Sequence, residues 1–402
     1  MIDKSKLVET KEGLAKIFIP NPKLYTRSDG IYEPSWAPVF YNPQMAFNRD
    51  IAVLFLRSIK TQLKKLVVYE PLAGTGVRGI RIALEVGDVE ELVMNDININ
   101  AYELMKINVE LNNLTNITRL ENRDANALMF EDYAKDLKAS YIDVDPFGSP
   151  ANYVQSSLLL VKRGGYVAYT ATDLAPLTGK YPLKALRRYQ VHIMRTDFEK
   201  ELAIRSLISY IVRRGAELDI ALQPVLAYYT DHYIRAYFKV DKGAMKSINT
   251  LKNLGYILYC SNCLYRDIIT QYLIPSGFET HCPLCKSEAM ILGPLWIGKL
   301  ACKEVVEDMI NELERTKWLV AFTRAIKLLT TILSEIDIEN PYYRVDTLCS
   351  RLKTYMPKIS ELIECIESEG YRAKRTHFDE RGVKTNAPLS IIKQCIKSLR
   401  SD

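Results

Sequence analysis

The chain has 402 residues, of which 48% are hydrophobic and 25% are charged, and this composition excludes intrinsic disorder and a continuous coiled coil. The formal net charge of +6 permits a nucleic-acid partner without requiring one. No stretch of about 18 residues is apolar throughout, so we expect no membrane partner. The first residues mix acids and bases, so we expect no secretory signal and a cytoplasmic location.

The first 50 residues are rich in Pro, Tyr and Asn, which predicts short strands and loops. A helix is predicted from Pro43 to Leu63, with Asn42 as its N-cap. From Leu66 to Val240, β-rich runs alternate with helical segments, which predicts a doubly wound α/β sheet whose last two strands form a hairpin at its edge. The predicted strands are Leu66–Tyr69, Glu91–Asn95, Ile117–Glu121, Tyr141–Val144, Gly165–Ala171, Val225–Tyr229 and Tyr233–Lys239. The predicted helices between them include Arg78–Val86, Ile99–Asn112 and Tyr153–Val161.

A glycine-rich turn follows the first of these strands and leads directly into a helix. Gly74, Gly76 and Gly79 let the backbone turn tightly and let a ligand approach it closely. Asp96 follows the second strand, where a carboxylate can hold ribose hydroxyls. Asp124 follows the third strand, where an acid can accept a hydrogen bond from an adenine amine. This ordered set predicts a nucleoside-bearing cofactor and fits both S-adenosylmethionine and NAD.

The end of the fourth strand distinguishes these two cofactors. Asp145-Pro146-Phe147 resembles the signature of methyltransferases that act on the exocyclic amines of bases. Such an amine is a poor nucleophile, so a side-chain oxygen and a backbone carbonyl accept its N–H groups while the aromatic ring stacks on the base. We therefore favour Asp145, Pro146 and Phe147 as catalytic residues. Asp143 is the alternative acid, because strand positions two apart share a face.

Further segments resemble the archaeal form of the tRNA (guanine-26) N2-dimethyltransferase family. They are Phe40–Pro43, Asn48–Asp50, Gly79–Arg81, Asp143–Pro150, Thr170–Asp173, Ala227–Ala236, Thr376–Phe378 and Lys384–Pro388. The resemblance implies an α/β fold with a class I, Rossmann-like methyltransferase domain, which transfers two methyl groups from S-adenosylmethionine to the N2 amine of guanine 26 in tRNA.

The same resemblance implies roles for five residues around the cofactor. Arg49 is expected to bind the methionine carboxylate, for which a guanidinium fork is suited, and Arg78 to assist in the glycine turn. Asp96 is expected to bind the ribose. Asp124, with the backbone of Ala125, is expected to bind the adenine.

Two Cys-x-x-Cys pairs predict a second kind of site. Four thiolates at this spacing are typical of a tetrahedral zinc ribbon with no open position for substrate, so we expect a structural zinc. The predicted ligands are Cys260, Cys263, Cys282 and Cys285. Cys302, Cys349, Cys365 and Cys395 have no such spacing and are predicted to be core residues.

The C-terminal region is predicted to bind tRNA. Two short helices are expected between Val345 and Tyr371, followed by a β-hairpin wing over residues 372–384 that carries five Lys or Arg against two acids, with Tyr371, His377 and Phe378 interleaved. We predict a methyltransferase domain over residues 1–298, with a zinc-binding insert at about 254–292, and a winged-helix-like α+β tRNA-binding domain over residues 299–402.

Three alternatives stay open from the sequence. The protein could methylate an amine of another nucleic-acid base, or it could bind RNA without catalysis and keep a relic cofactor pocket. A dinucleotide oxidoreductase is the most distant of the three. The sequence indicates no particular protein partner or oligomeric state, and it does not distinguish one methyl transfer from two.

Overall fold

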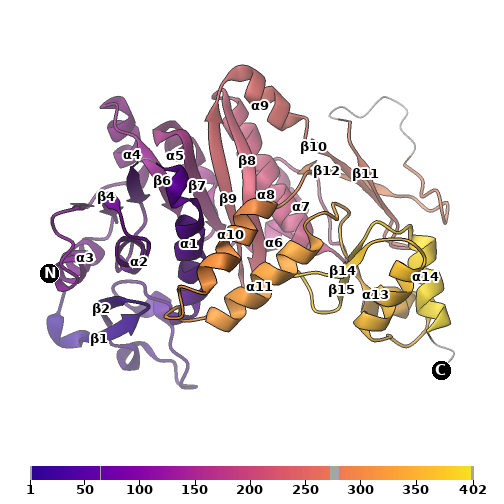
Figure 1. Cartoon of the computed structure of the whole chain (residues 1–402), viewed down its shortest axis with the longest axis horizontal. Helices are drawn as coiled ribbons and strands as arrows, with labels where there is room; N and C mark the ends of the chain where they lie inside the picture. The colour runs from indigo at the N-terminus through magenta and orange to yellow at the C-terminus, as the bar shows by residue number, and fades with distance from the viewer. Residues whose placement is uncertain (1, 64, 272–279, 400–402) are drawn as a thin grey trace.

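A seven-stranded sheet forms the centre of the computed structural model, which describes residues 2–63, 65–271 and 280–399 (Figure 1). Its strands lie in the order β5-β4-β3-β6-β7-β9-β8, with the first five parallel and β9 antiparallel to both of its neighbours. The strand order reverses at β3, and open α/β sheets bind ligands beside such a reversal. The strands are β3 (Leu66–Glu70), β4 (Val89–Asn95), β5 (Thr118–Glu121), β6 (Ala139–Val144), β7 (Val161–Ala171), β8 (Ile220–Thr230) and β9 (Tyr233–Lys242).

Every predicted strand of this sheet is present. The predicted hairpin is also confirmed, because β8 pairs only with β9 within the sheet and forms its edge. The helix predicted from Pro43 is divided. A 3-10 turn over Pro43–Met45 precedes the α-helix, and Asn42 caps this turn by accepting a hydrogen bond from the Gln44 amide at 2.9 Å.

Helices cover both faces of the sheet, because alternate strand residues point to opposite sides. Val68 and Leu92 face one hydrophobic core, and their neighbours Tyr69 and Val93 face the other. The first core is shared with α1 (Ala46–Ile59), α2 (Val77–Val86), α3 (Ile99–Leu111), α10 (Lys303–Leu313) and α11 (Phe322–Glu335). The second is shared with α4 (Ala125–Ala134), α5 (Val154–Leu160), α6 (Leu174–Leu177), α7 (Pro182–Tyr189) and α8 (Glu199–Ala216).

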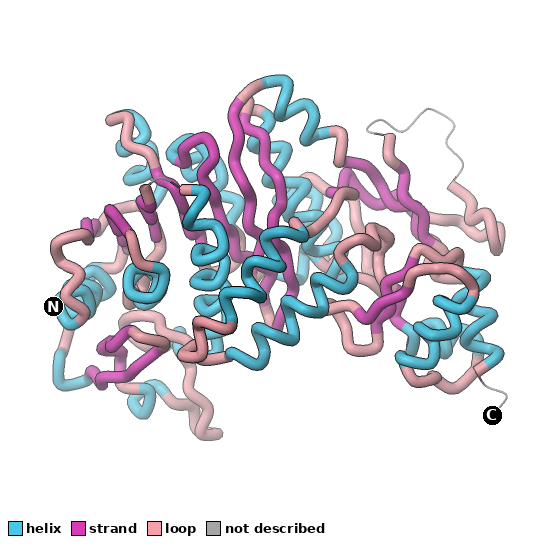
Figure 2. Tube along the Cα trace, viewed as in Figure 1, coloured by secondary structure: helices cyan, strands magenta, loops and turns pink. Residues whose placement is uncertain are grey.

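Smaller sheets lie on either side of the central one (Figure 2). The N-terminal hairpin of β1 (Leu7–Glu12) and β2 (Ala15–Pro20) packs against α2 and α3. The predicted insert follows α9 (Ala244–Leu251) and forms a three-stranded antiparallel sheet, although its residues 272–279 lie outside the described residues. The strands of the insert are β10 (Leu254–Tyr259), β11 (Arg266–Ile269) and β12 (Met290–Trp296).

The C-terminal region contains the two predicted short helices and the predicted hairpin. The hairpin pairs β14 with β15, and β13 adds a third strand. The elements are β13 (Tyr343–Arg344), α12 (Val345–Leu352), α13 (Ile359–Ser368), β14 (Ala373–Arg375), β15 (Gly382–Thr385) and α14 (Leu389–Ser398). Across the described helices, none has the length and apolar character that a membrane crossing needs.

Helices α10 and α11 follow the predicted domain boundary at residues 298/299, yet they pack on α1. Arg57 of α1 donates a hydrogen bond to Glu312 at 2.7 Å. Asp50 of α1 accepts one from the Ala321 amide at 2.6 Å. The division of the chain at residue 298 stays a prediction.

The four remaining cysteines are predicted to be core residues, and Cys395 is fully buried with Cys365 packed against the same core, but the sequence does not predict that these two are bonded to each other. Cys365 and Cys395 form a disulfide that joins α13 to α14. They are 30 positions apart in the sequence, so no local spacing reveals the pair. Cys349 is buried as expected, and Cys302 is half-buried with its thiol donating a hydrogen bond to Glu304 at 2.9 Å.

Candidate active site and metal centre

A cavity of about 640 Å³ opens at the carboxyl ends of β3, β4 and β6. It lies at the reversal of strand order, where the fold predicts a ligand. The predicted residues Arg49, Arg78, Asp96, Asp145, Pro146 and Phe147 all line it. The lining also includes Phe40, Gln44, Glu70, Gly74, Tyr153, Thr172, Asp231, His232 and Tyr233.

The glycine turn forms one wall of this cavity. Gly74 and Gly76 have φ values of +56° and +76°, a left-handed conformation that favours glycine. A Cβ on Gly79 would lie 2.6 Å from the sulfur of Met94, so only glycine lets α2 approach the sheet so closely. Asp96 accepts a hydrogen bond from the Gly74 amide at 2.9 Å. This hydrogen bond holds the Asp96 carboxylate, the candidate for binding the ribose, against the glycine turn.

Asp124 and Ala125 lie one strand further along, outside the lining of the cavity. Asp124 is the N-cap of α4 and accepts hydrogen bonds from the amides of Asn126 and Ala127 at 2.9 and 3.0 Å. Tyr153, which the sequence analysis did not single out, lines the cavity. Burial raises the pKa of Tyr153, and the charges of Asp124 and Asp96 raise it further. Tyr153 therefore lies at the end of the cavity that is nearest to Asp96 and Asp124.

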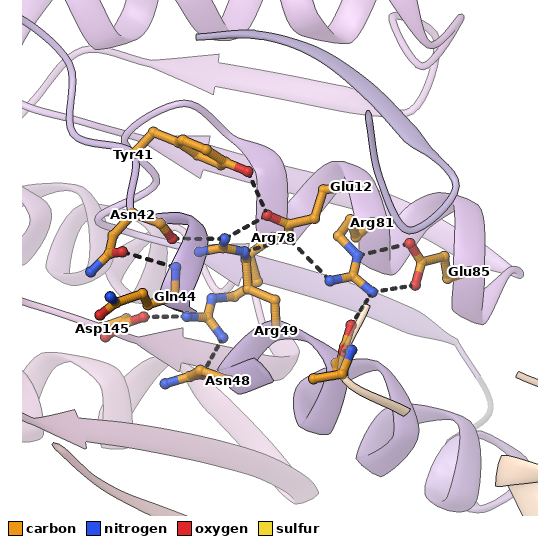
Figure 3. A network of polar contacts seen from close by, with 12 residues as sticks. Glu12, Tyr41, Asn42, Gln44, Asn48, Arg49, Arg78, Arg81, Glu85 and Asp145 are labelled. Carbon is orange, nitrogen blue, oxygen red and sulfur yellow. Dashed lines mark hydrogen bonds and ion pairs between the residues drawn. The ribbon is translucent and has the colours of Figure 1, made fainter. Parts of the chain in front are cut away.

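Arg49 is held by a carboxylate that the sequence analysis also missed (Figure 3). Its Nε and Nη2 atoms lie 2.6 Å from the two oxygens of Glu12 in β1. Tyr41 donates a hydrogen bond to the same carboxylate at 2.9 Å, and Arg81 does so at 3.0 Å. Burial alone would raise the pKa of Glu12, but the charges of Arg49 and Arg81 outweigh it and lower this pKa to about 2.

Two acids near the end of β6 have different environments. Asp143 is fully buried and accepts hydrogen bonds from Arg235 and from the Tyr141 hydroxyl, the latter at 2.6 Å. Burial would raise the pKa of Asp143, yet the charges of Arg235 and Arg78 lower it overall. Asp145 lies beyond the last strand residue and lines the cavity. The structure therefore separates the two candidates and places only Asp145 where a substrate can reach it.

Arg78 connects the two acids. It pairs with Asp145 and donates a hydrogen bond to Asn48 at 2.9 Å (Figure 3). It also lies 3.5 Å from Asp143. Glu70 lies 3.6 Å from the same guanidinium, and burial raises the pKa of Glu70 to about 8. The glycine-turn arginine thus contacts the catalytic candidate, a contact that the sequence spacing does not predict.

An aromatic pair lies at the mouth of the cavity. The ring of Phe147 is 74% exposed and meets the ring of Phe40 edge-on, with centroids 4.6 Å apart. The Thr172 amide donates a hydrogen bond to the Gly148 carbonyl, and the Gly148 amide donates one to the Thr172 hydroxyl, both at 2.8 Å. These two bonds close the loop that carries Phe147. A large exposed aromatic beside a cavity acid suits a flat base that enters from solvent.

The four predicted cysteines lie together in the ribbon. Their sulfur atoms are all within 4.8 Å of one another, and tetrahedral zinc with bonds of about 2.3 Å needs sulfurs about 3.8 Å apart. In each knuckle the first cysteine carbonyl accepts a hydrogen bond at 2.9 Å, from the amide of Leu264 or of Lys286. Both of these residues have positive φ values, 65° and 61°. The two matching knuckles fit a structural zinc.

The wing presents less positive charge than its sequence suggests. Lys384 is buried and lies 3.2 Å from Glu201, and Phe378 is also buried. His377 is enclosed beside Glu335, so neither aromatic is available for stacking on RNA. The sequence prediction is wrong for these three residues, because the pattern of a short hairpin does not reveal what packs beneath it. Arg372, Arg375 and Arg381 remain exposed.

The strand order, the glycine turn at its reversal and the acid beyond the next strand define a class I S-adenosylmethionine-dependent methyltransferase fold, here with a zinc-ribbon insert. Within that class, residues 20–397 match the model of the N2,N2-dimethylguanosine tRNA methyltransferase family, and the chain belongs to this family.

Named relatives and a solved structure resemble the chain over nearly its full length. The tRNA (guanine(26)-N(2))-dimethyltransferase of Sulfurisphaera tokodaii is 40% identical over 97% of this chain and 99% of its own length. That of Saccharolobus solfataricus is 39% identical over 98% of this chain and 100% of its own. The structure of Trm1 from Pyrococcus horikoshii with S-adenosyl-L-methionine covers 97% of this chain and 100% of its own, at 36% identity and a TM-score of 0.84.

The buried Glu12 carboxylate generates a pH-dependent prediction. Glu12→Gln should lower the free energy of unfolding at pH 7 by roughly 3 kcal/mol, since one pKa unit corresponds to about 1.4 kcal/mol. The folded-state pKa of about 2 lies below the ordinary value of 4.5, so this contribution is present above pH 4.5 and is lost as the pH falls toward 2. Denaturant unfolding across this range measures the difference. Glu9→Gln, on the exposed side of the same strand, is the control, and an equal effect of both variants would contradict the prediction.

The cysteine cluster generates a second prediction. The purified protein should contain about one zinc per chain by elemental analysis. Cys260→Ser should lose the metal and local order in the ribbon, because thiolate ligation contributes folding free energy. Cys302→Ser, which alters a cysteine outside the cluster, should keep the metal. If wild-type protein that is purified with zinc supplied throughout contains no zinc, the assignment is refuted.

Proposed function

We propose that this protein transfers two methyl groups from S-adenosylmethionine to the N2 amine of guanine 26 in tRNA. The observation that carries the proposal is the position of Asp145 in the lining of the cavity. The chain also aligns over nearly its full length with relatives named tRNA (guanine(26)-N(2))-dimethyltransferase. A tRNA substrate is consistent with a cytoplasmic location, which we include in the proposal.

The proposed cofactor-binding residues include three that line the cavity, Arg49, Arg78 and Asp96. S-adenosylmethionine supplies an electrophilic methyl group when bound. Asp96 holds the ribose hydroxyls beside the Gly74 amide, and Arg49 binds the carboxylate while Glu12 fixes its orientation. Asp124 and the backbone of Ala125 bind the adenine, and Tyr153, which lines the cavity and is influenced by the charge of Asp124, lies at this end of the site.

Asp145 activates the base amine. Its carboxylate accepts one N2–H, its negative charge would stabilise the positive charge that develops on nitrogen during methyl transfer, and it would then take the proton that the methylated nitrogen loses. The backbone beside Pro146 accepts the second N–H, and Phe147 stacks on the base. Arg78 acts as a positioning residue, because it fixes the Asp145 carboxylate from the wall of the glycine turn.

Two successive transfers need space for the amine to rotate after the first. Gly148 follows Phe147 with φ of +79°, and the space at its Cβ position is open. We therefore place the first methyl group against the Gly148–Ser149 turn and the loop over residues 170–174.

Analysis of modified nucleosides tests the proposed function. A defined tRNA transcript incubated with the protein and cofactor should yield N2,N2-dimethylguanosine, and a transcript with guanine 26 replaced should yield none. Methylation of a different base would support the rival amine methyltransferase. Failure to bind S-adenosylmethionine in calorimetry would support the non-catalytic alternative.

The catalytic role of Asp145 predicts a large kinetic effect. Asp145→Asn keeps an acceptor oxygen but removes the charge, so the single-turnover rate of methyl transfer should fall by at least about 100-fold. Binding of S-adenosylmethionine and tRNA should change little. Asp88→Asn, at the opposite end of β4, is the control and should react at the wild-type rate. A near-wild-type rate for Asp145→Asn would overturn the assignment.

The exposed charges of the wing generate a further prediction. Replacing Arg372, Lys374 and Arg375 by Ala should weaken tRNA binding and reduce its salt dependence by about 0.7–0.9 in slope for each phosphate that these side chains neutralise. Lys374 already pairs with Glu367 at 2.7 Å, so the two arginines should account for most of the change. Fluorescence anisotropy over a salt series measures this slope. Cofactor affinity should be unaltered, and an unchanged slope would show that the wing does not contact RNA.

A further inference from the structure

A second basic surface lies on α7, in a part of the chain that the proposed mechanism does not use. From Leu174 to Thr196 the chain contains five Lys or Arg and no Asp or Glu. Lys184 and Arg187 are exposed three positions apart in α7, which places them on one side of the helix, and Lys180 is exposed two residues before the helix begins. None of the three forms an ion pair among the described residues.

Apolar and aromatic side chains lie between these cations. Leu183 is 82% exposed and Tyr181 is 52% exposed. Ala185 and Tyr189, on the opposite side of the helix, are fully buried in the core beneath the sheet. Positive charge interleaved with an exposed aromatic ring suits a phosphate backbone with an unstacked base or ribose beside it.

The C-terminal end of α7 is hydrogen-bonded to the loops at the mouth of the cavity. The Tyr189 hydroxyl lies 2.7 Å from the Ser149 hydroxyl and donates a hydrogen bond to Asp173 at 2.6 Å. Arg188 donates to the same carboxylate at 2.9 Å. Ser149 and Asp173 flank the loop that carries Phe147, so α7 is fixed in place relative to the substrate entrance.

The chain that leaves α7 is joined to the zinc ribbon. His192 and Gly293 of β12 exchange backbone hydrogen bonds, both at 2.8 Å. The segment that carries these cations is therefore hydrogen-bonded both to the loops beside the cavity and to the insert. By contrast, the wing neutralises Lys374, Arg381 and Lys384 with neighbouring acids.

We propose that Lys180, Tyr181, Leu183, Lys184 and Arg187, the α7 surface, bind the sugar-phosphate backbone of the tRNA next to the nucleotide that enters the cavity. This inference rests on the proposed function and extends it, because it assigns a substrate contact separate from the wing. The cations bind phosphates, and Tyr181 with Leu183 packs against a neighbouring ribose or base.

The test compares charge-removing variants in tRNA binding. Lys180→Gln, Lys184→Gln and Arg187→Gln combined should weaken tRNA binding about tenfold or more at moderate salt and reduce the salt slope by about 2, since each neutralised phosphate contributes about 0.7–0.9. Affinity for S-adenosylmethionine should stay at the wild-type value, which also reports that the fold is intact. Lys180→Arg with Lys184→Arg should retain the wild-type slope.

A matched control removes three exposed charges at the opposite end of the sheet, namely Lys65, Lys135 and Arg163, and should leave both quantities unchanged. Equal losses in the control and the α7 variant would overturn the proposal, as would wild-type affinity and slope in the α7 variant. A wild-type protein that forms no N2-methylated guanosine would refute the proposed function itself. Nucleoside analysis in the same reaction therefore separates the two failures.

Discussion

A charge that is removed from water must be paired, and this constraint organises the centre of the molecule. Arg81 has no exposed surface and contacts three carboxylates, Glu12, Asp50 and Glu85. These acids come from β1, α1 and α2, so one guanidinium fixes the N-terminal hairpin against two helices. Breaking a buried pair of this kind costs about 3–5 kcal/mol, which explains why the hairpin is fixed although its own sheet has only two strands.

The same constraint separates the acids that serve structure from those available for chemistry. Asp143 lies inside β6 and is neutralised by Arg235, which is itself fully buried. Asp145 lies one residue past the strand, where the sheet no longer covers it. Arg78 contacts both acids, so the wall of the cofactor cavity and the catalytic candidate share a single guanidinium.

Much of this fold follows from local sequence patterns. Strands bounded by glycine or aspartate alternate regularly with helices, and two cysteine knuckles have a spacing that only a few structures use. The predictions of the sheet, the glycine turn and the metal cluster each depend on short segments. The conformation of such a segment is determined mainly by its own residues. Their positions around the cavity follow because the carboxyl ends of parallel strands meet at one edge.

What the sequence did not predict depends on contacts between distant segments. Glu12 precedes its partner Arg49 by 37 positions, and an isolated glutamate in a strand carries no sign of a buried ion pair. Lys384 and Phe378 belong to a hairpin that looks exposed until Glu201 of α8 and the interior of the C-terminal region are placed beneath it. The sequence does not reveal the disulfide between Cys365 and Cys395 for the same reason, because the two cysteines meet only when their helices pack side by side.

The packing of α10 and α11 has a practical consequence for dissecting the protein. Leu329 and Ile332 of α11 are buried in the same core as Ile51 of α1, and Arg57 of α1 pairs with Glu312 of α10. A fragment that stops at residue 298 would expose that apolar side of α1 and leave Arg57 without its acid, which favours aggregation. A fragment that continues through α11 keeps the layer closed and is the better starting point for expressing the catalytic half alone.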